Sequence, residues 1–413
     1  MTTEFDRMQA SRRRFMTAAG AASLAAAVPG VARAQGRQAL KVSVGRQPWA
    51  AGNSPLTQLM IAQKTFEKFA ADMGYDLTID WRDYPSAAPM VEAFVSGNLD
   101  FGMWGNTPIV RLIAQNQPLQ IVSVGEGHFR FVLATRKDSP IRNVADIKGK
   151  TVGALLGGDP YNVLTQWLRY ELGNPDPKAH NITVVNTPTQ AQAATIPSGM
   201  DAAVLIHPAF LKAQAEIGTV GIVNSFGYTE SHYKGPAGEG AGILLESVKK
   251  SAFYPDGYYL HRSFWIGHGN LIKQHPNVVA AFVMAQQDGV NKLKGMDAGQ
   301  VSELSRKYWE LPPELGAKVV KDEVLFDRGW VWPTEGDALA LLETSKYMVD
   351  GKMIPKPLDW SQVKGAFAQT AAPLRTAYEK SGRKPDLAAF SAKDAKDLRG
   401  APSWEAASWR ERT

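Results

Sequence analysis

An apolar strand-like run followed by a short polar turn, a proline and a helical stretch occurs four times in this chain. The four turns lie at residues 53–55, 106–108, 157–160 and 207–208. A polar cap residue and a proline at the first helical position both favour a helix start. Open α/β sheets bind ligands where strands lead into helices at the carboxyl ends of the strands. The pattern therefore predicts a cleft lined by helix amino ends, whose free N–H groups suit an anion.

The stretch 98–108 shows this pattern most fully, as a short buried strand, a glycine turn and a helix start. Trp104 and Asn106 are placed there to offer a stacking face and a hydrogen-bonding group. The same residues also suit an ordinary capped helix packed in a core. Both interpretations stay open for Trp104, and equally for Trp49.

Length and charge place the chain among ordinary globular proteins. Its 413 residues predict about two domains, and 44% hydrophobic with 21% charged residues is typical of a folded protein. The formal net charge is +6, of which residues 1–34 contribute +3, with five arginines against Glu4 and Asp6. The remaining +3 is too small to indicate nucleic-acid binding.

Residues 1–34 have the pattern of an export signal. The run Ser-Arg-Arg-Arg-Phe-Met at 11–16 precedes an alanine-rich segment and the small-x-small triplet Ala-Arg-Ala at 32–34. This pattern resembles a twin-arginine signal, which predicts export of the folded protein to a bacterial periplasm. A cytosolic amphipathic helix is the alternative, which Pro29 and Gly30 oppose. The chain has no cysteine, which excludes disulfides, thiolate metal sites, catalytic thiols and a lipid-modified amino-terminal cysteine.

From residue 40 onward, strand and helix patterns alternate, which indicates parallel sheets covered by helices. A first series includes one long helix at 55–73, and a strand at 129–135 leads out of it. A second series follows at 151–223, and a strand at 258–266 could return to the first unit. Two such crossovers predict an α/β protein of two hinged lobes with the ligand between them. We expect lobe 1 at 35–135 and 257–380 with extra carboxyl-terminal helices, lobe 2 at 136–256, and a loosely packed tail at 381–413.

Several residues resemble the nitrate/sulfonate/taurine-type solute-binding proteins of ABC importers. Leu99-Asp100-Phe101-Gly102 with Gly105 and Pro108 looks like a motif of that family, and residues 137–153 resemble the start of its second lobe. Asp201, Pro208 and residues 270–279 are similar to later landmarks, so that the resemblance covers about residues 40–295. It implies a type 2 periplasmic binding fold without cofactor or catalysis. The implied role is a monomeric periplasmic protein that passes a small organic anion, sulfonate- or carboxylate-like, to an inner-membrane permease.

Carried over by position, the resemblance also implies a set of ligand contacts. They are Gln47, Pro48, Trp49, Ser54, Trp104, Asn106, Thr107, Gly158, Asp159, Tyr161 and His207. His207 stands where the family commonly has an acidic residue, so it either favours an anion or serves the structure alone.

Two other functions stay open. An exported, cofactor-dependent enzyme is one, although the sequence has no His-Glu-x-x-His, no cysteine cluster and no Gly-x-Ser-x-Gly elbow. A pyrimidine-synthesising branch shares the implied fold, but its cysteine-rich motif is impossible here. A sensory protein that presents its ligand to a membrane receptor is the other, and it would use the same lobe surfaces.

Overall fold

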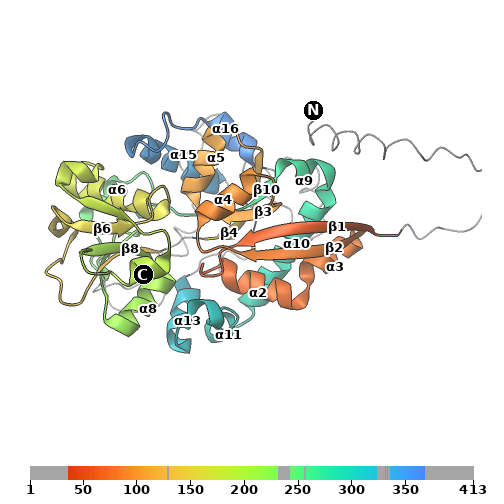
Figure 1. The fold of residues 1–413 in the computed structure, drawn as a ribbon, viewed down its shortest axis with the longest axis horizontal. Coiled ribbons are helices and arrows are strands. Elements are labelled where there is room, and N and C mark those ends of the chain that lie inside the picture. The colour runs from red at the N-terminus through yellow and green to blue at the C-terminus, as the bar shows by residue number, and fades with distance from the viewer. Residues whose placement is uncertain are drawn as a thin grey trace, which may run out of the picture. The chain divides into compact units, whose positions relative to one another are not determined.

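Two five-stranded sheets form the framework of the described residues (Figure 1). The structure, a computed structural model, describes residues 36–127, 130–230, 242–254, 257–322, 331, 333 and 335–367. The expected export signal at 1–34, residues 368–380 of the expected lobe 1 and the expected tail at 381–413 lie outside these ranges. Within them, no helix combines the length and the apolar character that a membrane crossing requires.

The first sheet has the strand order β2-β1-β3-β10-β4. Its strands are β1 (Gln38–Arg46), β2 (Tyr75–Asp83), β3 (Phe101–Trp104), β4 (Leu119–Glu126) and β10 (Ser263–His268). β1 pairs in parallel with β2 and β3, whereas β10 runs antiparallel between β3 and β4. We call this sheet and the helices packed on it lobe 1.

The second sheet repeats the arrangement with the order β7-β6-β8-β5-β9. Its strands are β5 (Phe131–Thr135), β6 (Thr151–Ala154), β7 (Thr183–Asn186), β8 (Ala202–Ile206) and β9 (Val220–Asn224). β6 is parallel to β7 and β8, whereas β5 is antiparallel to β8 and β9. We call this sheet and its helices lobe 2.

In each sheet, the antiparallel strand is the first strand that the chain forms after it crosses between the lobes. The chain leaves lobe 1 after β4 to form β5, and it returns to lobe 1 through residues 257–262 to form β10. This confirms the two-lobed α/β fold that the sequence predicts. The expected boundary at residue 135 differs from the sheets in one respect. β5 lies in lobe 2, because its whole length pairs with β8, from Phe131 opposite Ile206 to Thr135 opposite Ala202.

Six helices in the described residues before residue 295 pack on the sheet of lobe 1. They are α2 (Asn53–Gln63), α3 (Thr65–Asp72), α4 (Ala87–Val95), α5 (Asn106–Ala114), α9 (Gly269–Gln274) and α10 (Pro276–Lys294). The single helix expected at 55–73 is two, because Lys64 adopts a left-handed backbone with φ of 51° and ends α2. Beneath them, the rings of Phe101 and Phe282 stack at 4.3 Å in the buried core.

The helices of lobe 2 are α6 (Asp159–Leu172), α7 (Gln190–Ala194) and α8 (His207–Ile217). Short 3-10 turns lie at η1 (Val144–Ile147), η2 (Pro177–His180) and η4 (Glu246–Lys250). α6 is fixed from within by Trp167, which is fully buried and whose indole N–H donates to the Asn224 carbonyl.

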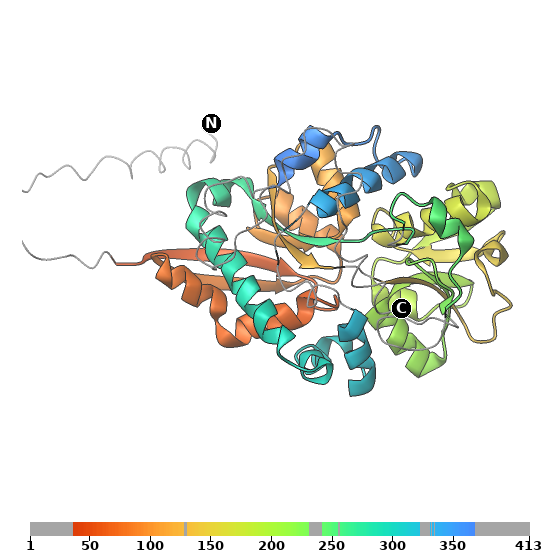
Figure 2. The same ribbon diagram turned by 180° about the vertical axis from the view of Figure 1, so that it is seen from behind.

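The carboxyl-terminal helices contact both lobes (Figures 1 and 2). They are α11 (Ala298–Glu303), α12 (Arg306–Trp309), α13 (Pro313–Asp322), α15 (Glu335–Asp350) and α16 (Trp360–Ala366). α15 packs on α5 of lobe 1 and on α6 of lobe 2, where Asp350 pairs with Arg169. On the other side, α12 and α13 meet α8 of lobe 2, and Glu310 pairs with Lys212. These helices therefore join the lobes instead of extending lobe 1 alone.

Candidate functional site

A cleft between the lobes consists of two connected chambers in the described residues. The inner chamber encloses about 620 Å³ that no atom fills, part of it open to solvent, and the outer chamber about 1300 Å³. Both are lined by Trp49, Pro85, Thr189, Gln190 and Ile206, which form the passage between them. The cleft is the concave, mostly apolar kind of space in which small molecules bind.

The sheet topology explains the position of the inner chamber. Its lining residues follow the carboxyl ends of the parallel strands: Gln47 and Trp49 after β1, Ser86 after β2, Gly105 after β3, Gly158 after β6 and Thr187 after β7. Phe131 and Ser263 enter from the amino ends of the antiparallel β5 and β10. In both sheets, the carboxyl ends of the parallel strands thus point toward the cleft, as the rule for open α/β sheets predicts.

Asp159, the first residue of α6, joins the two lobes at the inner chamber. Its Oδ1 accepts hydrogen bonds from the Thr107 backbone N–H at 2.9 Å and the Thr107 hydroxyl at 2.8 Å. The Tyr259 hydroxyl in the second crossover donates to the same oxygen at 2.6 Å. Asn162, one turn along α6, donates to the Thr107 hydroxyl at 2.7 Å. A lobe 2 carboxylate therefore caps α5 of lobe 1.

The surroundings of Asp159 keep it ionised. Burial raises the pKa of its carboxyl group, but His261, Tyr259 and the Thr107 N–H together outweigh burial and hold that pKa below its ordinary value. The Nε2 atom of His261 lies 3.7 Å from Oδ2. Burial, followed by the negative charge and hydrogen bond of Asp159, raises the pKa of Tyr259 well above its ordinary value. The Tyr259 hydroxyl thus remains a proton donor to Asp159.

Glu126, at the end of β4, occupies a second helix start. Its Oε1 accepts from the Gly52 N–H at 2.9 Å and from the Asn53 N–H at 3.4 Å, at the beginning of α2. Its Oε2 accepts from the Ser263 hydroxyl at 2.7 Å. The N–H groups that begin α2 and α5 are therefore bound by carboxylates of the protein, and a ligand does not find them free.

Gly105 permits the close approach of the lobes at this point. A Cβ atom on Gly105 would lie 2.2 Å from Asp159 Oδ2 and 2.4 Å from His261 Nε2. Both distances are far below van der Waals contact, so a larger residue here would push the Asp159–His261 pair away from β3.

Of the expected ligand contacts, Gln47, Trp49, Gly158 and Asp159 line the inner chamber. Thr107 lies behind them as the partner of Asp159. The structure places the others elsewhere, as follows.

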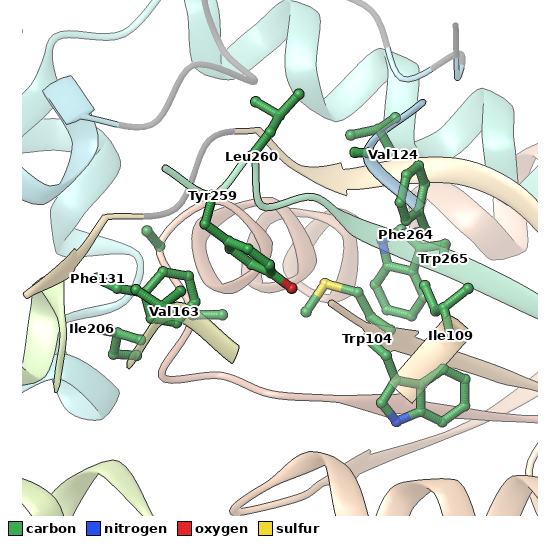
Figure 3. Packing of buried hydrophobic residues seen from close by; sticks show 14 of the residues in the cluster. Trp104, Ile109, Val124, Phe131, Val163, Ile206, Tyr259, Leu260, Phe264 and Trp265 are labelled. Atoms are coloured by element: carbon green, nitrogen blue, oxygen red, sulfur yellow. The ribbon is translucent and has the colours of Figure 1, made fainter. Parts of the chain in front are cut away.

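Trp104 differs most from its expected role. It is fully buried in lobe 1, packed edge-on against Phe94 at 5.2 Å, and its indole N–H donates to the Ala87 carbonyl. Figure 3 shows its ring beside Ile109, with Tyr259 lying between this lobe 1 cluster and Phe131, Val163 and Ile206 of lobe 2. Trp104 points into the core because β3, which carries it, is buried on both faces.

Asn106 and His207 line neither chamber. The Asn106 amide donates to the Leu260 carbonyl and accepts from the Arg262 N–H, which fixes the second crossover. The backbone N–H of His207 donates to the Arg130 carbonyl at 3.1 Å, and its Nε2 lies 3.5 Å from Arg130 Nη1.

The remaining expected contacts, Pro48, Ser54 and Tyr161, are buried or half-buried residues that do not line either chamber among the described residues.

Sequence reasoning missed several lining residues, among them Ser86, Glu126, Thr187, His261 and Ser263. The strand-end rule would have found the first three had it been applied after every strand, since they follow β2, β4 and β7. His261 and Ser263 could be found only by recognising that β10 runs antiparallel and brings its amino end to the cleft.

Metal-ligating side chains do not gather in the described part of the chain, where no group of three or more His, Asp or Glu is placed to hold an ion.

Comparison with known proteins identifies the family. A family model described as NMT1/THI5 like matches residues 68–295, more than half of the 413 residues. The chain belongs to this family. The match runs from α3 through both crossovers to the end of α10, and it therefore includes most of both sheets.

One curated relative shares a shorter stretch. The "Putative aliphatic sulfonates-binding protein" of Escherichia coli (strain K12) is 33% identical over 92 residues, which are 22% of this chain and 29% of that protein.

Among solved structures, the fold is similar to that of the periplasmic aliphatic sulphonate binding protein SsuA from Escherichia coli. The TM-score is 0.56 at 18% identity, covering 79% of this chain and 91% of that one. The desulfurization enzyme DSZB has a similar fold, with a TM-score of 0.53 at 13% identity and coverage of 84% and 100%. Binding proteins and an enzyme thus share the architecture, so fold alone does not decide between them.

Proposed function

We propose that the protein is the solute-binding component of an ABC importer, which captures a small organic anion between its lobes. The observation that carries the proposal is the cleft at the carboxyl ends of two similar sheets joined by two crossovers. Such an arrangement lets lobes hinge around a ligand. The family relatives named as sulfonate-binding proteins support the anionic ligand class.

Neutral donors hold the anion in this proposal. Among the described residues that line the inner chamber there is no Lys or Arg, and Glu126 and Asp159 are already hydrogen-bonded within the protein. Helix starts that line the chamber without a capping side chain include those of α4, at Ser86, and α6, at Gly158. They come from opposite lobes, so an anion between their N–H groups would favour closure. The two nearby carboxylates favour a single negative charge over two.

The same proposal includes where the protein is located, which partner receives its ligand and whether it acts as a monomer. The twin-arginine pattern at 11–16 and the periplasmic relative support a periplasmic location. The partner would be an inner-membrane permease that receives the ligand, and the protein would act as a monomer. Gln47, Trp49, Ser86, Gly158, Thr187 and His261 are the residues that we propose contact the ligand.

Calorimetric titration of the mature protein with a panel of alkanesulfonates, carboxylates and nitrate tests this function. We expect at least one monoanion to bind with a Kd of order micromolar, about −8 kcal/mol, and to raise the Tm. Native mass spectrometry of gently purified protein would identify a retained ligand. If no anion binds at millimolar concentration and no small molecule is retained, anion capture is refuted.

A catalytic role is the alternative function, because the desulfurization enzyme DSZB has a similar fold. We propose a non-catalytic protein, because the chain has no cysteine and its chamber pairs Asp159 with hydrogen-bond donors instead of with a nucleophile. Recovery of the bound anion unchanged after long incubation supports binding, and its conversion would show an enzyme. Uptake lost on deletion of the gene distinguishes a permease partner from a sensory receptor.

A further inference from the structure

The outer chamber is wider than the inner one and has a different chemistry. Its lobe 2 wall, formed by α7 and α8, includes the small or apolar residues Ala194, Pro208, Ala209 and Ala213 beside polar ones such as Gln190 and Thr195. The facing wall includes three aromatic residues, Trp49, Tyr308 and Trp309. Tyr308 and Trp309 belong to α12, which lies beyond residues 68–295 that the family model matches.

The aromatic wall is held in place by buried charge. Arg46, only 5% exposed at the end of β1, donates to the Tyr308 hydroxyl at 2.8 Å and to Asp83 at 2.6 Å. The Tyr308 hydroxyl in turn donates to Asp83 at 3.1 Å, and the Arg46 guanidinium lies 5.4 Å from the centre of the Tyr308 ring. Trp309 is 4% exposed. The contacts with Arg46 and Asp83 fix the Tyr308 ring, and burial restricts the Trp309 ring, before any ligand arrives.

The charges at this chamber do not recruit an anion. Lys212 is the one cationic side chain among the described residues that line it, and it pairs with Glu310 and lies 3.9 Å from Glu216. The rim therefore carries more negative than positive charge. The described lining of the inner chamber has no Lys or Arg either, but it presents the helix starts at Ser86 and Gly158. We therefore assign the charged head of an anion to the inner chamber and an uncharged, apolar group to the outer one.

We propose that the outer chamber is a second subsite, which binds an aromatic or alicyclic ring carried by the same ligand whose anionic head lies in the inner chamber. Trp49 lines both chambers and separates head from ring. The fixed faces of Tyr308 and Trp309 on one side and the alanine-rich surface of α8 on the other leave room for a flat group. The preferred ligand is thus a ring-bearing organic anion instead of a short alkyl or inorganic one. This inference rests on the proposed function.

Calorimetric titration with ethanesulfonate and 2-phenylethanesulfonate tests the second subsite. The two probes share the head and differ in the ring. Since burying an aromatic ring is strongly favourable, we expect the ring-bearing probe to bind at least about tenfold more tightly. Ala209→Trp, which places an indole on the α8 wall, is expected to abolish this advantage. Ala145→Trp, on the exposed surface of η1, is the matched control and should retain it. Ala191→Trp on α7 replaces Ala209→Trp if that variant does not fold.

The outcomes are distinguishable. If both probes bind with equal affinity, or if the advantage of the ring survives in both chamber variants, the second subsite is overturned while anion capture stands. If neither probe binds, anion capture of sulfonates fails and the second subsite fails with it. A ring advantage that only the chamber variants remove supports the proposal.

Discussion

Removing the Asp159 carboxylate is expected to weaken lobe closure. In Asp159→Ala, the Thr107 N–H, the Thr107 hydroxyl and the Tyr259 hydroxyl lose the oxygen that accepts from all of them. A hydrogen bond to a charged group contributes about 1.5–3 kcal/mol. Bonds that share one acceptor are not additive, so we expect a total cost of about 3 kcal/mol. Because Thr107 belongs to lobe 1 and Asp159 to lobe 2, this cost falls on the closed arrangement.

A cost of about 3 kcal/mol borne by the binding-competent arrangement lowers the apparent affinity for ligand by about 100-fold. Small-angle scattering without ligand should show a larger radius of gyration for Asp159→Ala than for the wild type. Asp138→Ala removes an exposed aspartate of lobe 2 and serves as the control. Equal affinity and equal scattering for Asp159→Ala and the wild type would refute the idea that this carboxylate joins the lobes.

The same contact has a predictable pH dependence. The folded pKa of Asp159 lies below its ordinary value of 3.8, so its contribution to stability is present above that value and is lost as pH falls through the folded pKa. The difference in Tm between the wild type and Asp159→Ala should therefore shrink only below about pH 4.

Three further substitutions test the site and its supports. Gly105→Ala introduces a Cβ atom that would lie 2.2 Å from Asp159 Oδ2, so displacement of Asp159 should lower ligand affinity by more than about tenfold; an unchanged affinity would contradict the close approach. Trp104→Ala should cost about 3–5 kcal/mol in urea unfolding because its ring is fully buried, and loss of ligand affinity without loss of stability would return Trp104 to the binding site. Arg262→Met should cost about 3–5 kcal/mol, since it leaves the buried Asp337 without its 2.7 Å partner; the double variant Arg262→Met, Asp337→Leu should recover much of that, and a double variant no more stable than the single one would count against this account.

The helix starts show how much of the fold local sequence patterns can predict. The proline patterns correctly predict that helices begin near residues 53, 106, 159 and 207, because these signals depend on neighbouring residues alone. The expected capping by local polar side chains is not observed, since no N-cap side chain accepts a hydrogen bond in any of these four helices. The occupants of the helix amino ends could not be predicted in the same way. Glu126 reaches α2 and Asp159 reaches α5 across 74 and 52 residues of chain, and no local pattern encodes such contacts.

The direction in which a side chain points could not be predicted from local sequence patterns either. An aromatic residue at the end of a strand can face the ligand or the core, and only the packing of α4 on β3 puts Trp104 in the core. The break at Lys64 depends on a left-handed backbone that lysine rarely adopts, so the helical periodicity across it gives no warning.

The late position of β10 in the sequence limits the order in which the two sheets can form. β3 and β4 are joined only through β10 in the described sheet, so lobe 1 remains an incomplete sheet until residue 268 has been synthesised and lobe 2 already lies between. β5, in contrast, is synthesised before its partner strands β8 and β9, which come about 70 to 90 residues later, so it stays unpaired until then. Pairings this distant in sequence form slowly, and a chain cut after lobe 2 would leave β4 without a partner strand and β3 with an open edge. Because unpaired strands are prone to aggregate, the sheet of lobe 1 is protected only once residues 263–268 have been synthesised and have joined β3 to β4.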